Sequence, residues 1–181
     1  GLPEVLLNRA TVLVDLARVE EAEAILRSLI AADRHFAEAH MCLSHILLQD
    51  GRYAEGWEEY AWHSLSAQGR PQTTYAYPTW NGERLEGPLL LRAMHGLGDQ
   101  IMFASCLSDI GQLSERCILE CDERLVSLFV RSFPEVHVCG KRKENPDAWA
   151  GMDMAPVAQA MLSGLPRMFR RSSDSFPTHS G

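Results

Sequence analysis

The sequence repeats itself at its start, where one block of the chain is followed directly by a second block of the same pattern. When residues 3–36 are laid onto residues 37–70, residues 17–22 fall on residues 51–56, between two stretches of helical apolar spacing. Apolar residues three and four apart without an internal proline predict helices, which we place at residues 4–16, 19–32, 37–49 and 53–67. One such helical pair cannot cover its own apolar face, so successive copies are expected to stack.

The repeat length, about 34 residues, resembles that of the tetratricopeptide repeat. The second copy keeps the turn residue Gly51 and the aromatic residues Tyr53 and Tyr60, but Gly56 stands where the family prefers alanine and His40 where an aromatic residue is usual. The resemblance implies that the first helix of each pair lines a concave surface that binds a protein or peptide partner. Carried over position by position, the partner-binding candidates are Leu7, Thr11, Met41, His45 and Leu48. The alternative is that these side chains only face solvent or pack against a further repeat.

A segment rich in proline, glycine and aromatic residues follows the repeats. We read residues 69–87 as an ordered linker, because Tyr75, Tyr77 and Trp80 are too many aromatic side chains for a flexible tether. The predicted organisation is therefore a repeat domain at residues 1–68, the linker, and a second domain at residues 88–181.

The hydrophobic pattern changes after the linker. Short apolar runs alternate with helical stretches, which predicts a parallel sheet with right-handed crossovers. We expect strands at residues 89–93, 117–121 and 136–138, a possible fourth strand at 152–154, and helices at 100–113, 123–132 and 156–162. The predicted fold class is α/β, in which all-α tetratricopeptide helix pairs precede a Rossmann-like parallel sheet of three to four strands.

The loop after the first predicted strand, residues 96–99, is the strongest candidate site in the second domain. It lies where doubly wound sheets bind ligands, at the carboxyl end of a strand and the start of a helix. Its two glycines, Gly96 and Gly98, permit close approach by a ligand. The alternative is that Asp99 only caps the helix and binds no ligand. Ile101 stands where a dinucleotide-binding fingerprint requires glycine, so we expect no nicotinamide or flavin cofactor.

The run from Trp80 and Gly82 through residues 89–91 to residues 96–104 adds a second resemblance. It is similar to bacterial proteins that join tetratricopeptide repeats to a domain like the heptosyltransferases, glycosyltransferase family nine. The resemblance implies a GT-B fold of two Rossmann-like lobes, of which residues 88–181 correspond to the N-terminal one. It also implies Asp99 as the general base. Our candidates to bind a sugar or nucleotide sugar are His95, Gly96, Leu97, Gly98 and Gln100, although Met94 and His95 stand where the family usually has glutamate and glutamine.

Composition excludes several other classes of protein. The net charge of −7 argues against a nucleic-acid partner, and no apolar run approaches the roughly 20 residues of a membrane span. Five cysteines without a Cys-x-x-Cys pair indicate reduced thiols, a cytoplasmic location and no metal site. The basic run at residues 141–143 is more typical of a solvated loop than of a phosphate site.

Two functions remain open. The first is a protein-interaction module joined to a glycosyltransferase-like lobe that is not catalytically complete. The alternative is a glycosyltransferase that moves a sugar from a nucleotide-sugar donor to an acceptor hydroxyl, with Asp99 as base.

Overall fold

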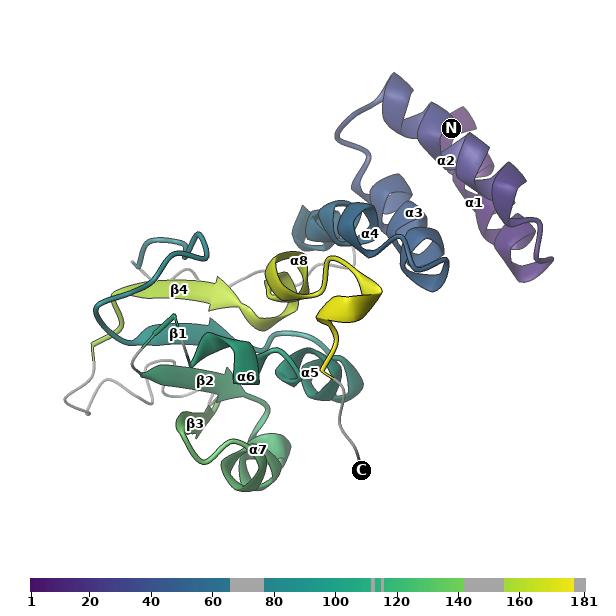
Figure 1. Cartoon of the computed structure of the whole chain (residues 1–181). Coiled ribbons are helices and arrows are strands. Elements are labelled where there is room, and N and C mark those ends of the chain that lie inside the picture. Colours follow the sequence, from purple (N-terminus) through teal and green to yellow (C-terminus); the bar gives the residue numbers. More distant parts are fainter. Residues whose placement is uncertain (66–76, 112, 115, 142–154, 178–181) are drawn as a thin grey trace. The chain divides into compact units, whose positions relative to one another are not determined.

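The computed structural model describes residues 1–65, 77–111, 113–114, 116–141 and 155–177. The chain divides into two compact units, one made of Gly1–Pro71 with Arg170–Gly181 and the other of Gln72–Phe169. The first unit is helical, and the second is built around a parallel sheet, so the predicted α/β fold class is confirmed (Figure 1). Among the described helices, none combines the length and apolarity that crossing a membrane requires.

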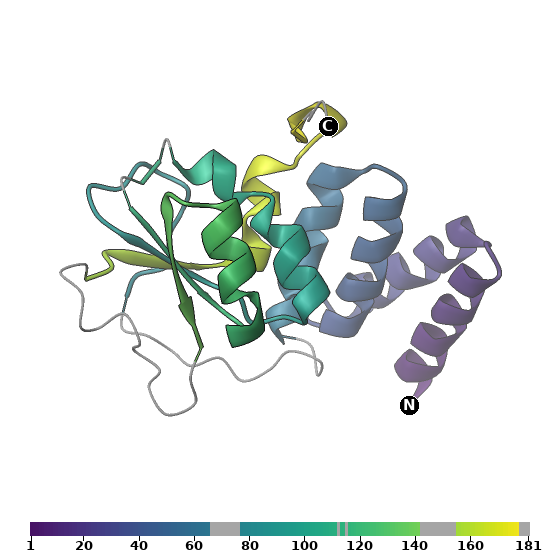
Figure 2. The same cartoon turned by 90° about the horizontal axis from the view of Figure 1, so that it is seen from below.

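The helical unit contains two hairpins whose helices lie close to the predicted ranges. Hairpin 1 consists of α1 (Leu2–Asp15) and α2 (Val19–Ala32). Hairpin 2 consists of α3 (Ala37–Gln49) and α4 (Tyr53–Tyr60), after which Ala61–Leu65 forms a 3-10 turn. The helices of hairpin 1 lie side by side in both views (Figure 1 and Figure 2). One core joins the two hairpins, and its buried members are Ala10, Leu13, Ala22, Leu26, Leu29, Ala39, Leu43, Ile46 and Leu47.

The two hairpins turn in the same way at equivalent positions of the repeat. The backbone N–H of Arg18 donates to the Leu13 carbonyl at 2.8 Å, and that of Arg52 donates to the Leu47 carbonyl at the same distance. Such a bond back across the helix end is the mark of a Schellman turn, which needs one residue with positive φ. Gly51 supplies it in hairpin 2 with φ +77°, whereas the matching residue in hairpin 1 is Ala17 with φ +57°. Hairpin 1 therefore holds an alanine in a conformation that favours glycine.

Three contacts of the His40 ring explain the departure of hairpin 2 from the tetratricopeptide pattern at this position. The His40 ring stacks on Trp62 with centroids 4.2 Å apart, so this imidazole fills an aromatic position. Its Nδ1 bonds to the Glu59 carboxylate and its Nε2 lies 3.0 Å from the Arg34 carbonyl. Both ring nitrogens of His40 therefore face an oxygen atom of another residue.

The C-terminal segment covers one end of the helical unit. The Phe176 ring lies 4.9 Å from the Tyr53 ring of α4, and Arg171 forms a 3.1 Å ion pair with Glu58 of the same helix. The buried Arg170 guanidinium lies 5.8 Å from the Phe176 ring centroid. Residues distant in sequence from the repeats thus contact α4, the last helix of the two hairpins.

The second unit contains a four-stranded parallel sheet in the order β3-β2-β1-β4. Its strands are β1 (Leu89–Arg92), β2 (Cys117–Cys121), β3 (Val136–Gly140) and β4 (Ala158–Met161). Every residue of β1 and β2 is buried, as expected for central strands of a sheet covered on both faces. Among the aromatic residues of the linker, Tyr77 packs against the buried side chains of Leu90, Ile118 and Cys139. Trp80 is 3% exposed, and Tyr75 lies outside the described residues.

The crossover helices are shorter than predicted. The stretch expected as one helix at residues 100–113 forms α5 (Leu97–Ala104) and α6 (Leu107–Ile110), and α5 begins ahead of the predicted start. After β2, a 3-10 turn at Glu123–Leu125 leads into α7 (Val126–Ser132), which packs along β3 (Figure 1). After β4, a 3-10 turn at Leu162–Gly164 leads into α8 (Pro166–Phe169).

The expected helix at residues 156–162 is wrong, because β4 occupies this stretch. The segment Ala-Gln-Ala-Met has high helix propensity, but it pairs in parallel with the edge of β1 that β2 leaves free. The Gln159 side chain also donates to the Tyr77 carbonyl at 2.8 Å, which ties this strand to the middle of the linker. The possible strand at residues 152–154 lies outside the described residues.

We expect Ala17→Gly to raise the free energy of unfolding by about 1 kcal/mol, because glycine adopts positive φ without the steric cost that alanine carries. Gly51→Ala should lower it by a similar amount. Chemical denaturation followed by far-UV circular dichroism measures both changes. Ala31→Gly, at an exposed helical position, is the control and should destabilise by about 1 kcal/mol. A loss of stability in Ala17→Gly would contradict the strain at this turn.

Candidate functional site

The order of the strands identifies one edge of the sheet as the place for a ligand. β2 and β3 lie on one side of β1 and β4 lies on the other, so the connections that leave β1 and enter β4 run in opposite directions. In doubly wound sheets, ligands bind at the carboxyl ends of the strands where this reversal occurs. Here that place is bounded by the β1–α5 loop and by the 3-10 turn after β4, and α5 contacts this turn.

The predicted glycines and aspartate form the start of α5. Gly96 is the residue before the helix, with φ −60° and ψ 165°, and Asp99 lies in the first turn. A Cβ atom at Gly96 would lie 3.4 Å from Oδ2 of Asp99, so this carboxylate turns back toward the helix start. At Gly98, by contrast, a Cβ would meet no atom within 4 Å outside its neighbours and its own helix. Asp99 is exposed and therefore borders open space.

Gln100 connects the two loops at this edge of the sheet. Its side chain is 4% exposed, and its Nε2 donates to the His95 carbonyl at 2.7 Å. Its Oε1 accepts from the backbone N–H of Asp122, after β2, at 3.0 Å. The predicted ligand contact thus uses its amide within the protein, where it fixes the β1–α5 loop against the loop after β2.

The remaining predicted residues flank the loop at intermediate exposure. The edge of the His95 ring packs on the buried Phe103, with centroids 5.7 Å apart, and Leu97 is half-buried. Lys141, the residue after β3, places its Nζ 2.9 Å from Sδ of Met94, which directly precedes His95. From the sequence we interpret Lys141 as part of a solvated loop. Only the position of β3 in the sheet reveals that Lys141 reaches the carboxyl end of β1.

Charged side chains near the strand ends are arranged in pairs. Arg92 of β1 and Glu120 of β2 are register partners, both almost fully buried, with Nε and Oε2 3.7 Å apart. After β2, hydrogen bonds from the exposed Arg124 side chain and backbone lower the pKa of the Asp122 carboxyl to about 2. Asp122 is therefore ionised at neutral pH, and its negative charge is matched by Arg124.

The loop combines an acceptor side chain with free backbone donors. Among the residues that the structure describes, no group of three or more His, Cys, Asp and Glu side chains is arranged around a metal position. What the loop offers is one exposed carboxylate, open space at Gly98 and the first amides of α5. A carboxylate accepts a hydrogen bond from a hydroxyl group, and free amides donate to a hydroxyl or phosphate oxygen.

The candidates on the helical unit fall into two groups. Met41 is 7% exposed, and Leu7 packs against the core of the two hairpins. Leu48 is half-buried and lies against α4, where a Cβ at Gly56 would come within 2.8 Å of its Cγ and Cδ2 atoms. These three side chains serve packing.

Thr11 and His45 form the second group, because both are exposed. The Thr11 hydroxyl donates to the Leu7 carbonyl at 3.2 Å within α1. Partial desolvation and the nearby charge of His63 lower the pKa of His45. At neutral pH His45 is therefore an uncharged ring, which can donate or accept one hydrogen bond but does not attract an acidic peptide.

Comparison with known proteins gives one informative relative. The chain is 36% identical over 148 residues to the protein FlbA of Caulobacter vibrioides, a match that covers 75% of this chain and 24% of FlbA. The chain therefore spans about a quarter of the length of this curated relative. No family model matches the chain, and no solved structure matches it.

Gln100→Leu should lower the free energy of unfolding by about 1–3 kcal/mol, since it leaves the His95 carbonyl and the Asp122 N–H without their buried partner. Hydrogen exchange should become faster at the Asp122 amide. Gln100→Glu keeps the acceptor for that amide but removes the donor to His95, so it should preserve the protection while still destabilising the loop. Met102→Ala, at an exposed position of α5, is the control. Unchanged exchange in Gln100→Leu would contradict the connecting role.

Gly56→Ala should destabilise hairpin 2 by about 1–3 kcal/mol, because the added methyl group overlaps Leu48. The matching pair in hairpin 1, one repeat earlier, is Val14 and Ala22. There the first side chain is smaller than leucine, and the second is larger than that of glycine. Gly56→Ala combined with Leu48→Val recreates this pair and should recover at least half of the loss. Thermal unfolding of the wild type, the two single variants and the double variant measures the coupling. If the losses of stability in the two single variants simply add in the double variant, overlap with Leu48 is not the cause of the destabilisation by Gly56→Ala.

Proposed function

We propose that the chain is a protein-interaction module of the tetratricopeptide type that carries a carbohydrate-binding, glycosyltransferase-like lobe. The observation that supports the lobe's role is the exposed Asp99 carboxylate beside the open space at Gly98, at the point where the strand order reverses. The resemblance of residues 96–104 to family nine glycosyltransferases supports the same role. In this proposal, the ligand is a sugar whose hydroxyl group donates to Asp99.

The charge of the loop favours the hydroxylated part of a ligand at this position. A phosphate placed directly against Asp99 meets a like charge, whereas a sugar hydroxyl meets an acceptor. Lys141 offers a cation at the same edge of the sheet, and the first amides of α5 offer donors. A nucleotide sugar is therefore accommodated with its sugar toward Asp99 and its phosphates toward Lys141.

The helical unit supplies the interaction part of the proposal. Two hairpins stacked in the phase of the repeat present α1 and α3 as consecutive first helices. Thr11 and His45 are the proposed partner contacts, because they are the exposed ones among the five candidates. An uncharged His45 favours a partner segment with polar, rather than acidic, side chains at that point.

The second candidate function is sugar transfer, and the same carboxylate favours it. Asp99 would accept the proton of an acceptor hydroxyl while the hydroxyl oxygen forms a bond to the anomeric carbon. The bond from that carbon to the donor phosphate then breaks, and the phosphate leaves with the electron pair. In a GT-B enzyme the donor is held by a second lobe, so we propose this activity only for a protein that supplies one.

Filling the open space at Gly98 tests the proposed ligand site. We expect free hexoses and nucleotide sugars to shift the amide resonances of residues 94–104 in the wild-type chain, and Gly98→Val to weaken this binding about tenfold or more. Gly111→Val is the matched control, since Gly111 is also an exposed glycine whose Cβ would meet no atom within 4 Å. Asp99→Asn retains the size of the side chain and should weaken sugars more than nucleoside diphosphates.

Equal shifts in the wild type and in Gly98→Val would contradict the site, as would shifts confined to other strand ends. If nucleoside diphosphates bind and free sugars do not, the loop is a phosphate site and the role of Asp99 is wrong. A loss of binding in Gly111→Val as well would show that the substitutions act through the fold.

A further inference from the structure

The segment of residues 170–177, which belongs to the helical unit, contacts α4 through two side chains. Arg171 Nη1 lies 3.1 Å from Oε1 of Glu58, and the ring centroids of Phe176 and Tyr53 lie 4.9 Å apart. The earlier residue of the segment thus meets the later residue of the helix. The segment therefore runs antiparallel to α4.

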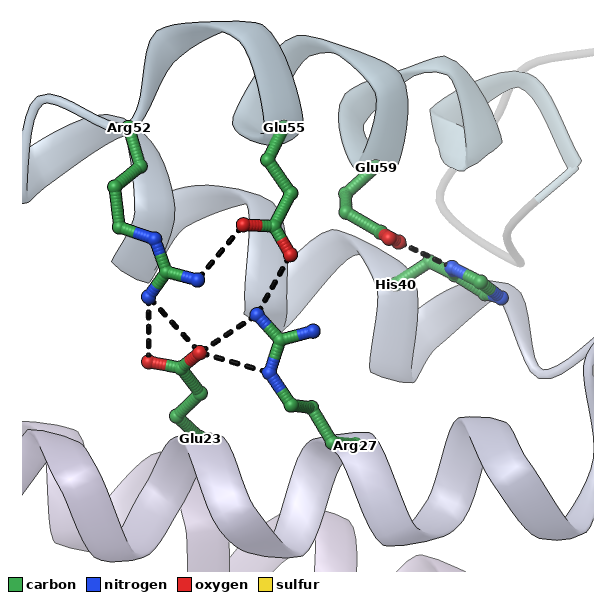
Figure 3. Close-up of polar contacts among 6 residues, drawn as sticks. All are labelled: Glu23, Arg27, His40, Arg52, Glu55 and Glu59. Atoms are coloured by element: carbon green, nitrogen blue, oxygen red, sulfur yellow. Dashed lines mark hydrogen bonds and ion pairs between the residues drawn. The ribbon is translucent and has the colours of Figure 1, made fainter.

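Helix α4 carries three glutamates, and two of them bind side chains of the two hairpins (Figure 3). The Glu55 carboxylate accepts hydrogen bonds from Arg27 at 2.6 Å and from Arg52 at 2.7 Å. The Glu59 carboxylate bonds to the His40 ring. These two glutamates therefore hold the helical unit together.

The third glutamate of α4, Glu58, pairs instead with the C-terminal segment at the protein surface. The side chains of Glu58 and Arg171 are 49% and 52% exposed, and Phe176 is 38% exposed. The buried residues of the core that joins the hairpins come from α1, α2 and α3, so these contacts lie outside it. Because an ion pair this exposed contributes little to stability, the segment can leave α4 without disrupting the core.

A turn inside the segment sets the spacing of its two contact residues. Ser173–Ser175 forms a 3-10 turn, which Ser172 and Ser175 close with a capping box. The Ser175 Oγ donates to the Ser172 carbonyl at 2.5 Å and accepts from the Ser172 backbone N–H at 3.2 Å. Five extended residues span about 17 Å, whereas five residues of a helix such as α4 rise only about 7.5 Å. The turn therefore shortens the segment toward the spacing of its partners on α4.

The charges of the two surfaces are complementary. Residues 1–68 contain five arginines and lysines against eleven aspartates and glutamates, whereas residues 170–177 contain two arginines and one aspartate. Arg170 is buried, and its guanidinium lies 5.8 Å from the Phe176 ring centroid. Residues 171–174 are exposed. The segment is thus anchored at its start and lies on the surface beyond it.

We propose that Tyr53 and Glu58 of α4 form a docking surface for a protein segment that carries an arginine, a short polar turn and an aromatic residue. Residues 171–176 are the ligand that the chain itself supplies to this surface. A partner with the same pattern binds by displacing residues 171–176, while Arg170 stays in place. The surface is separate from the proposed partner contacts on α1 and α3 and from the proposed sugar site.

An intrachain ligand makes this binding competitive. A segment tethered within a few residues of its site has an effective concentration on the order of millimolar, so a partner must compete with it. A partner therefore gains access either by a better match to Tyr53 and Glu58 or when the intrachain segment is weakened. The contact is an autoinhibitory one, which sets a threshold for partner binding at α4.

A peptide with the sequence of residues 170–177 tests the proposal on the whole chain. An open variant, Arg171→Ala with Phe176→Ala, removes both contacts of the intrachain segment and leaves α4 unchanged. We expect the fluorescently labelled peptide to bind the open variant about tenfold or more tighter than the wild type, because the tethered competitor is lost. Fluorescence anisotropy measures both affinities.

Charge reversal tests whether the peptide uses the same surface. Glu58→Arg in the open variant should abolish binding of the peptide, and a peptide with Arg171→Glu should recover it. Asp15→Arg is the matched control, since it reverses a charge at an exposed position of α1 and should leave the affinity nearly unchanged. A peptide with Ser175→Ala should bind more weakly, because it loses the bonds that close the turn.

Far-UV circular dichroism reports whether the open variant keeps its helices, and we expect an unchanged signal. Equal affinities of the wild type and the open variant for the peptide would overturn the proposal, as would a loss of helical signal in the open variant, which would make the segment part of the fold. Equal losses in Glu58→Arg and Asp15→Arg would show that net charge, and not this surface, attracts the peptide. None of these readouts involves sugar binding or the contacts on α1 and α3, so the outcome is independent of the proposed function.

Discussion

The pairing of β4 with β1 creates the reversal of strand order at which the candidate site of the α/β unit lies. A three-stranded sheet of β3, β2 and β1 would leave β1 at an edge, and no reversal of strand order would occur. Once β4 adds to the free side of β1, the first crossover helix starts beside the junction between the two halves of the sheet. The start of α5 and its exposed Asp99 therefore lie at a reversal of strand order only because of the last strand of the sheet, which comes much later in the chain.

Two adjacent residues, Asp99 and Gln100, have different roles at the β1–α5 loop. Asp99 is exposed and its carboxylate borders open space, whereas Gln100 is buried and both ends of its amide are used. Because Gln100 holds the loop through its own bonds, the Asp99 backbone is fixed without consuming the Asp99 side chain. This separation of positioning from binding is what a pre-organised site requires.

The sequence predicts those features that depend on local chemistry. The helix ranges of the two hairpins, the turn at Gly51 and the buried strands β1 and β2 follow from apolar spacing and from glycine. β4 does not follow, because Ala158–Met161 has helical propensity and only pairing with β1 makes it a strand. The contacts of Gln100 with Asp122 and of Lys141 with Met94 do not follow either, since they join segments that only the sheet brings together.

The two units are completed in different ways. The central strands of the sheet are buried along their whole length, because each is paired on both sides. The helical unit is built by one rule, a fixed repeat step that reproduces the turn, the core contacts and the charged rim. The repeat step therefore accounts for the contacts within the helical unit. The place of the β1–α5 loop follows instead from the strand order of the sheet, which no local repeat determines.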